Sequence, residues 1–357
     1  FYPVLNKGFT NIEMTKNKKV GYTIEFFPKA KKTKGWKFGS DENSKMFEAA
    51  MHLGTSEDVY LANVIRRPSL MSRDVSCHII GLDIETGKKL YEVGLNDSKY
   101  NVFSITSYFD KATNNATILG YYYDGDDKSM KGNSKGLCAI TINKSGEVVS
   151  KKYVSWTKDV SKFLDVNEKG KIKGEGYVHF HNFFTTADGR IFAFGEQYKR
   201  NADALGFAAN ALGGTGNLSK IVIEDMVFFE FTSEFELKNV KVMDKFKSTF
   251  PLETLGANMQ LAGYLVSAYG GFDYAFTQRD LAEDVFTVVY TDYDRDEREF
   301  KIKSTTWVDG DFEEDSFSFE TKKSSKGILP AKDGFILVME YLYKENQLDM
   351  RLEKVDY

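Results

Sequence analysis

Two histidines separated by one residue form the most suggestive chemical pair in this chain. In the run GYVHFHNFF, His179 and His181 fall on one side of an extended strand together with Tyr177, because side chains alternate between the two faces of a strand. Two imidazoles at this spacing can ligate one metal ion as neutral nitrogen donors. A third ligand would have to come from elsewhere in the chain. The alternative is that both rings are hydrogen-bonded packing residues.

An acidic run offers a second chemical pattern. The loop TDYDRDERE places Asp292, Asp294 and Asp296 at the spacing that opens many calcium-binding loops. The sixth position is Glu297 and the twelfth is Lys303, where an EF-hand has Gly and Glu, so the motif is not completed. Charge at the tip of a hairpin explains the run without a metal.

The remaining motifs identify no catalytic centre. The glycines of GGTGN complete neither a dinucleotide-binding nor a Walker pattern, and a strand rather than a helix is expected after them. The sequence contains no GxSxG elbow and no HExxH. A pair of carboxylates could hydrolyse glycosides, but with 52 acidic residues the sequence does not select the pair. We therefore predict no metal centre and no cofactor.

The elements that position these residues repeat along the chain. Six times a turn leads into a short apolar strand, and in most copies a second strand follows. The six strands read KKVGYTIEFF, SEDVYLANVI, NNATILGYYY, ADGRIFAFGEQY, AEDVFTVVYTDY and AKDGFILVMEYLY. Two later runs, CHIIGLDIETGKKLYEV and GLCAITINKSGEVVSKKYV, each predict a hairpin, because alternating apolar residues flank a tight turn that contains Gly.

Repeated strand units at this length predict one architecture above others. We expect an all-β fold and a single β-propeller domain over residues 1–357, with six blades favoured and seven also fitting the spacing. The rival is a pair of β-sandwiches, against which stands the lack of a Pro/Gly-rich linker. In the propeller, the alternating residues Ile191, Ala193, Ile336 and Val338 should be buried between blades.

One segment differs from everything around it. Residues 201–216 are rich in Ala and then in Gly, which predicts a short helical insertion after the strand that ends near Tyr198. It reads either as an ordered loop on one face or as a lid or partner-binding element. We expect a ligand, if one binds, to lie near Tyr177, His179 and His181, beside an innermost strand and beneath Ala204 to Leu212.

The composition excludes several classes of partner. The 357 residues include 29 Phe and 20 Tyr but only 5 Pro, which favours strands, and the net charge is −4 with no basic stripe for nucleic acid. No run approaches the ~18 apolar residues of a membrane span. Cys77 and Cys138 lie in strand-like runs, and two buried thiols or one bridge would fit equally.

Four segments together resemble a known family. VGYTIEFF, HFHNFFTTADGRIFAFGEQY, the Ala/Gly-rich insertion and SKIVIEDMVFFEF are similar to an uncharacterised family of propeller-like proteins from Bacteroidetes, a domain of unknown function. The resemblance covers nearly the full chain. It implies an exported protein of the Gram-negative envelope, periplasmic or at the cell surface, and it implies no activity and no functional residue.

These observations lead to a functional expectation. We predict a monomeric, non-catalytic binding or scaffold protein of the bacterial cell envelope, with a glycan or an envelope protein as its partner. The alternative is a glycan-directed hydrolase or lyase that uses carboxylates in the propeller channel. A pocket with two carboxylates at glycosidase spacing would favour the enzyme.

Overall fold

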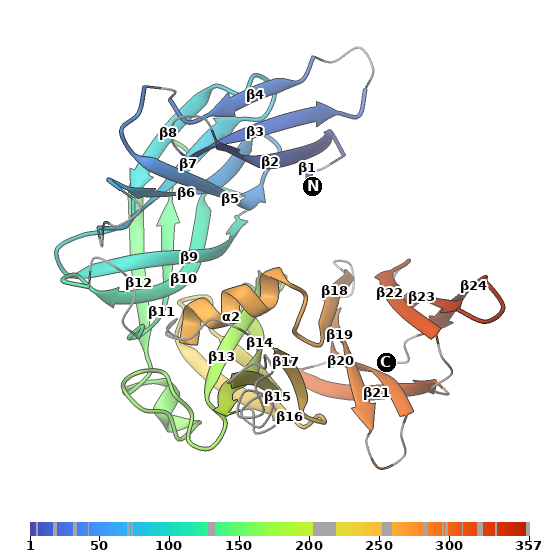
Figure 1. The fold of residues 1–357 in the computed structure, drawn as a ribbon. Coiled ribbons are helices and arrows are strands. Elements are labelled where there is room, and N and C mark those ends of the chain that lie inside the picture. The colour runs from blue at the N-terminus through green and yellow to red at the C-terminus, as the bar shows by residue number, and fades with distance from the viewer. Residues whose placement is uncertain are drawn as a thin grey trace, which may run out of the picture. The chain divides into compact units, whose positions relative to one another are not determined.

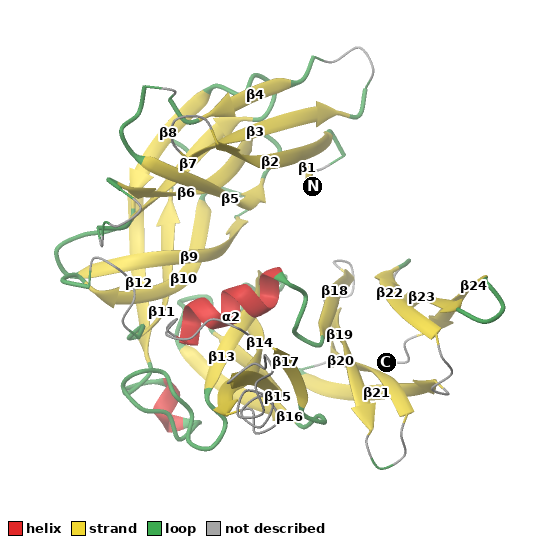
Figure 2. Cartoon of the chain, in the orientation of Figure 1, coloured by secondary structure: helices red, strands yellow, loops and turns green. Residues whose placement is uncertain are grey.

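The computed structural model describes residues 1–357 except 5, 17–19, 31–33, 42, 70–71, 73, 111, 128–132, 203–218, 252–258, 281–284, 295, 297–298, 309, 320–323, 333 and 355–357. Strands form nearly all of its regular structure, as Figure 2 shows. The sheets are meanders in which strands that follow one another in sequence are neighbours, except that β17 (Ser248–Pro251) pairs with β15 (Ser219–Phe231). The fold class is therefore all-β and propeller-like, as predicted.

The chain divides into two compact units, each described here by itself. The first unit comprises Phe1–Lys173 with the short stretches Asn182–Phe184 and Phe231–Lys238. Its sheets are coloured blue to green in Figure 1. Their strands are β1 (Tyr2–Val4), β2 (Gly8–Lys16), β3 (Val20–Pro28) and β4 (Trp36–Gly39); β5 (Phe47–Thr55), β6 (Val59–Arg67), β7 (Ser76–Asp83) and β8 (Lys89–Gly94); and β9 (Tyr100–Phe109), β10 (Ala116–Asp124), β11 (Gly136–Ile142) and β12 (Val148–Ser155). A single 3-10 turn, η1 (Val160–Lys162), follows.

Tight turns set the register of these meanders. Gly87 joins β7 to β8 with φ +67°, and Gly146 joins β11 to β12 with φ +86°, a backbone region that glycine enters without steric cost. Both pairs of strands are antiparallel. The two hairpins predicted from sequence are confirmed.

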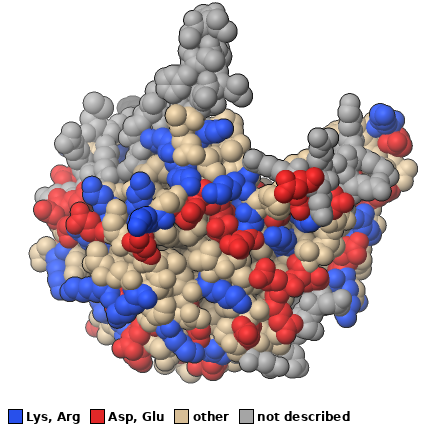
Figure 3. All heavy atoms as spheres, turned by 90° about the horizontal axis from the view of Figure 1, so that it is seen from below, with Lys and Arg blue, Asp and Glu red and all other residues tan. Residues whose placement is uncertain are grey.

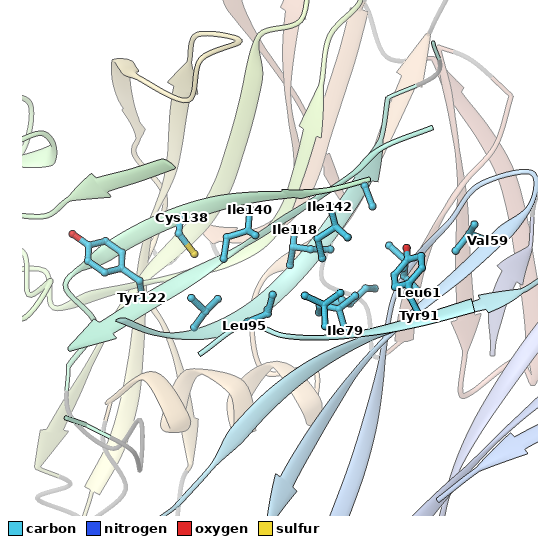
Figure 4. Close-up of a cluster of buried hydrophobic side chains, with 14 residues drawn as sticks. Val59, Leu61, Ile79, Tyr91, Leu95, Ile118, Tyr122, Cys138, Ile140 and Ile142 are labelled. Carbon is cyan, nitrogen blue, oxygen red and sulfur yellow. The ribbon is translucent and has the colours of Figure 1, made fainter. Parts of the chain in front are cut away.

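The middle sheet of the first unit is buried on both faces. Tyr60 and Ala62 of β6 pack in one apolar cluster with Ile24 of β3. Leu61, which points to the opposite face, packs in a second cluster with Ile118 of β10, drawn in Figure 4. A sheet that contacts a neighbour on each face belongs to a row of blades, whereas a sandwich sheet has one packed face.

The second unit comprises Gly174–His181, Thr185–Glu230 and Asn239–Tyr357. Its elements are β13 (Tyr177–Thr185), β14 (Ile191–Ala202), β15 (Ser219–Phe231), β16 (Leu237–Met243) and β17 (Ser248–Pro251); the helix α2 (Met259–Ala268); β18 (Tyr274–Asp280), β19 (Val285–Asp294), β20 (Glu299–Val308) and β21 (Asp311–Phe319); and β22 (Ser324–Pro330), β23 (Phe335–Leu342) and β24 (Gln347–Lys354). The described residues of the whole chain form six sheets. The number of blades in a closed ring and the single domain remain predictions.

The predicted core positions of this unit are confirmed. Ile191, Ala193, Ile336 and Val338 are all at most 1% exposed. Ile336 and Val338 of β23 join Val289 and Ile302 of the preceding sheet in one cluster. For Ile336 and Val338, the alternation predicted from sequence therefore corresponds to a contact between neighbouring sheets.

The helix α2 was not predicted. Its sequence MQLAGYLVSA is almost wholly apolar, so the pattern predicts a buried strand as readily as a helix. It ends in a Schellman motif, in which Gly270 N–H donates to Ser267 and Gly271 N–H donates to Val266, with Gly270 at φ +65°. The helical insertion predicted around residues 201–216 lies outside the described residues from 203 onward.

Candidate functional site

The predicted cluster lies on β13, the first strand of its sheet. Tyr177, His179 and His181 share the face that α2 covers, and the two imidazole centroids are 5.2 Å apart. Tyr177 packs against the same apolar cluster as α2, and its ring lies 6.4 Å from that of Tyr198. The strand alternation predicted from sequence therefore brings these three side chains together.

His181 forms an ion-pair geometry with a fully buried carboxylate. Its Nε2 lies 2.9 Å from Oε2 of Glu196 on β14, and the two side chains are 5% and 0% exposed. The backbone N–H of Tyr274 donates to the same oxygen at 3.0 Å. His181 also stacks on the ring of Tyr274 at 4.6 Å. Its imidazole is thus held by contacts on several sides.

The network continues to a buried lysine. Lys245 Nζ lies 3.4 Å from Glu196 and 2.5 Å from Asp273, whose carboxylate also accepts from the Ser248 hydroxyl at 2.7 Å. Burial alone would raise the pKa of Glu196, but His181 and Lys245 bring it below its ordinary value. Burial raises the pKa of Asp273 despite Lys245. Burial lowers the pKa of Lys245, and the two carboxylates more than restore it.

His179 is a packing residue in this arrangement. Its ring stacks on Phe272 at 4.8 Å and meets the edge of Tyr264 of α2 at 5.4 Å. Burial, with the neighbouring His181, holds the pKa of His179 well below its ordinary value, so the ring is neutral near pH 7. His181 thus has the hydrogen bond that the packing alternative requires, while His179 is held by ring contacts, and ligand binding at the two histidines remains a prediction.

The backbone of α2 at Gly263 packs closely against the side chains of Tyr198 and His179, and this contact fixes the helix over these rings. A Cβ at Gly263 would lie 2.6 Å from the Tyr198 hydroxyl and 3.3 Å from Nδ1 of His179, so the position requires glycine. The Tyr198 hydroxyl also donates to the Met259 carbonyl at the start of α2. The element that covers Tyr177, His179 and His181 is therefore α2. Segment 204–212, predicted to cover them, lies outside the described residues.

A second cluster on the opposite face of the same sheet was missed. Glu224 of β15 is 0% exposed, and its Oε1 lies 2.6 Å from Lys199 Nζ and 2.8 Å from Lys247 Nζ. The carboxyl group of Glu175 contacts that of Glu224, and this contact, with burial, raises the pKa of Glu175. Burial opposes ionisation of Glu224, but Glu175 and the two lysines lower its pKa. We call these four residues the Glu175–Glu224 cluster.

Both networks bring together residues that lie far apart in the sequence, so no motif spacing could reveal them. One signal was available. Glu196 is the one acidic residue inside the apolar run IFAFGEQY, and Glu224 lies with Asp225 inside the apolar run SKIVIEDMVFFEF. A charge within a buried strand needs a partner of opposite sign, which predicts an ion pair but does not name the partner.

Two acidic residues at the end of β19 pair with lysines of their own hairpin. Asp292 lies 3.0 Å from Lys303 and Asp294 lies 2.9 Å from Lys301, in both cases across to β20. Within the part of the chain that the structure describes, no group of three or more His, Cys, Asp or Glu residues is placed to hold a metal ion.

The surface charge and the two cysteines can also be compared with the predictions from sequence. On the face drawn in Figure 3, basic and acidic side chains are interspersed. Cys77 and Cys138 are free and buried, and burial raises the pKa of each thiol to about 12. No helix among the described residues is long and apolar enough to span a membrane.

Comparison with known proteins gives one full-length match. A model for a family of unknown function, DUF6770, matches residues 1–356. The expected membership of an uncharacterised, propeller-like family is thereby confirmed, while a Bacteroidetes origin remains a prediction. The growth-differentiation transition protein 5 of Dictyostelium discoideum is 23% identical over 231 residues, which are 61% of this chain but only 18% of that protein.

Distant likenesses to solved structures accompany this match. An uncharacterised protein of Listeria monocytogenes, lmo1340, is 8% identical over 100% of this chain and 86% of its own, with a TM-score of 0.35. BamB from Moraxella catarrhalis is 9% identical over 98% of this chain and 95% of its own, with a TM-score of 0.31. An endo-arabinase from Bacteroides thetaiotaomicron is 8% identical over 100% and 97%, with a TM-score of 0.30. Likenesses this distant carry no functional conclusion.

Proposed function

The chain belongs to DUF6770, a family of unknown function, and we propose that it is a non-catalytic binding protein. Its ligand contacts Tyr269, which is exposed, and the accessible parts of the half-buried side chains Tyr177, Tyr264 and Phe272 around α2. The glycan class is proposed first, because aromatic rings that carry polar groups can stack on sugars while they donate hydrogen bonds.

The observation that supports this role is how the buried polar network holds α2. His179 stacks on Phe272 and contacts Tyr264, while Glu196 accepts hydrogen bonds from the backbone immediately after Phe272. These contacts fix aromatic side chains at the edge of a rigid sheet. Tyr269, directly after the helix, is 73% exposed. Binding surfaces built on rigid elements lose little conformational entropy when a ligand binds.

The geometry of the Glu175–Glu224 cluster argues against the hydrolase alternative at this place. Glycosidases separate their two carboxyl groups by about 5 Å or more, to leave room for the sugar or for water. Glu175 and Glu224 instead share the same two lysines, Lys199 and Lys247, whose Nζ atoms lie 3.8 and 3.9 Å from Glu175 and 2.6 and 2.8 Å from Glu224. The contacts of these groups are those of an internal ion network.

Binding to a glycan array and then titration calorimetry with the best ligand would test the proposal. The double variant Tyr177→Ala, Tyr269→Ala should weaken binding at least about fivefold, since two aromatic contacts contribute about 1 kcal/mol or more. Tyr343→Ala, a change at another exposed tyrosine of the same unit, should leave affinity unchanged. Unaltered affinity in the double variant would place the ligand elsewhere, and binding to proteins alone would replace the glycan class.

We also propose that the protein is exported to the cell envelope, which is the location that the family resemblance implies. Fractionation of the natural host should recover it with periplasmic or surface proteins. Recovery with the cytoplasmic proteins would contradict this location and leave the binding role to be judged separately.

A further inference from the structure

The last sheet ends in a strand that has a neighbour on one side. β24 pairs with β23 over its whole length, and among the described residues no strand lies on its other side. The preceding sheet, β18 to β21, has a further strand at the corresponding place. An edge strand presents a row of backbone N–H and C=O groups to any additional strand.

One face of β24 is apolar and exposed. Leu348, Met350 and Leu352 are 52%, 62% and 54% exposed. The register places them opposite Tyr341, Met339 and Leu337 of β23, which extend the same apolar row inward. A strand added at the edge would bury part of this row as well as pair the backbone.

The charged residues on the other face of β24 favour a second copy of β24 as the added strand. Asp349 and Arg351 flank Met350, and Arg351 also pairs along its own strand with Glu353 at 2.6 Å. In an antiparallel pair of two such strands centred on Met350, Asp349 stands opposite Arg351 twice and Leu348 stands opposite Leu352 twice. A slip of two residues places Arg351 against Arg351 or Asp349 against Asp349, which like charges disfavour.

We propose that β24 pairs antiparallel with β24 of a second copy of this chain, about a two-fold axis through Met350. The two three-stranded sheets become one sheet of six strands. This is an isologous contact, because each copy offers the same self-complementary strand. It replaces the expectation of a monomer and stands apart from the proposed binding function.

Charge exchange across the edge tests this pairing. Sedimentation or light scattering of the native chain at about 100 μM should give twice the monomer mass, since a micromolar Kd leaves mostly dimer there. Asp349→Arg and Arg351→Asp should each be monomeric, because each places like charges opposite one another twice. An equimolar mixture of the two variants should recover the doubled mass, because every cross-strand pair is again of opposite sign.

A matched control is Glu313→Arg on β21, an exposed charge reversal on the outer strand of the neighbouring sheet, which should leave the dimer intact. A native chain that stays monomeric at every concentration would overturn the proposal, and so would a dimer that survives both single exchanges. Failure of the mixture to dimerise, after both variants become monomeric, would reject the register centred on Met350.

Discussion

Glu196 accepts hydrogen bonds from backbone and side chain while it is fully removed from water. Its oxygens contact His181 and Lys245 and the N–H groups of Asp273 and Tyr274. A carboxylate in such a position is bound tightly to its partners, because each of them would be left buried and unpaired without it. The residue is therefore central to the packing beneath α2.

Replacing this carboxylate should be costly. Glu196→Gln keeps the shape but removes the charge opposite Lys245, and breaking a buried ion network in this way costs about 3–5 kcal/mol. Urea unfolding followed by circular dichroism would measure the loss. Glu234→Gln, which removes a highly exposed partner of Lys152, should cost at most about 1 kcal/mol. Equal effects in the two variants would contradict the role given to Glu196.

Glu175 should make the second unit respond to pH. Contact with Glu224, burial and the negative charge of Glu224 raise the pKa of Glu175, while Lys199 and Lys247 oppose the shift. A group with a raised pKa binds its proton more tightly in the folded state, so its contribution is present at low pH and is lost as pH rises through the folded pKa.

Measured against Glu175→Gln, the native chain should therefore lose relative stability as pH increases above about 4.5, the ordinary value for Glu. Midpoints of urea unfolding at a series of pH values would show this difference. Glu168→Gln, at an exposed position, should follow the native curve. A difference that grows in the opposite direction would show that Glu175 is ionised in the fold.

Some residues of the candidate site could be predicted from the sequence and others could not. The face shared by Tyr177, His179 and His181 follows from strand alternation, and the structure places the three as that pattern predicts. Lys245 and Asp273 could not be found in this way. Their contact with Glu196 joins three separate segments, and only the folded chain brings those segments together.

At the scale of elements, turn chemistry was the most informative signal. The matching turns ADG before Ile191 and KDG before Ile336 contain Gly189 at φ +83° and Gly334 at φ +71°. Glycine adopts this backbone region easily, so the turns and the strands after them could be predicted. The helix α2 gave no such signal, because an apolar run of ten residues lacks the polar stripe that marks an amphipathic helix.

The docking of α2 predicts an unusual effect of alanine. In an exposed helix, Gly→Ala stabilises by about 1 kcal/mol. At Gly263 the added methyl would meet the Tyr198 hydroxyl at 2.6 Å, so Gly263→Ala should instead destabilise by about 1–3 kcal/mol. Thermal unfolding would measure it. Ser267→Ala, on the exposed side of the same helix, should be neutral or slightly stabilising, and a stabilising Gly263→Ala would show that α2 is not packed as described.

At the scale of the whole molecule, the single-domain prediction can be examined by calorimetry. Blades in an array are stabilised mainly by their neighbours, so a single domain should unfold in one cooperative transition. The calorimetric and van't Hoff enthalpies should then agree. Two resolved transitions would show that the two compact units unfold independently.

The two buried thiols can report how often the first unit opens. Cys77 and Cys138 are the only cysteines of the chain, both are at 0% exposure, and both belong to the first unit. A thiol reagent in solution can react with them only after the strands around them separate. At a reagent concentration high enough for labelling to outpace reclosing, the labelling rate is an opening rate of the first unit, and it is silent to events confined to the second.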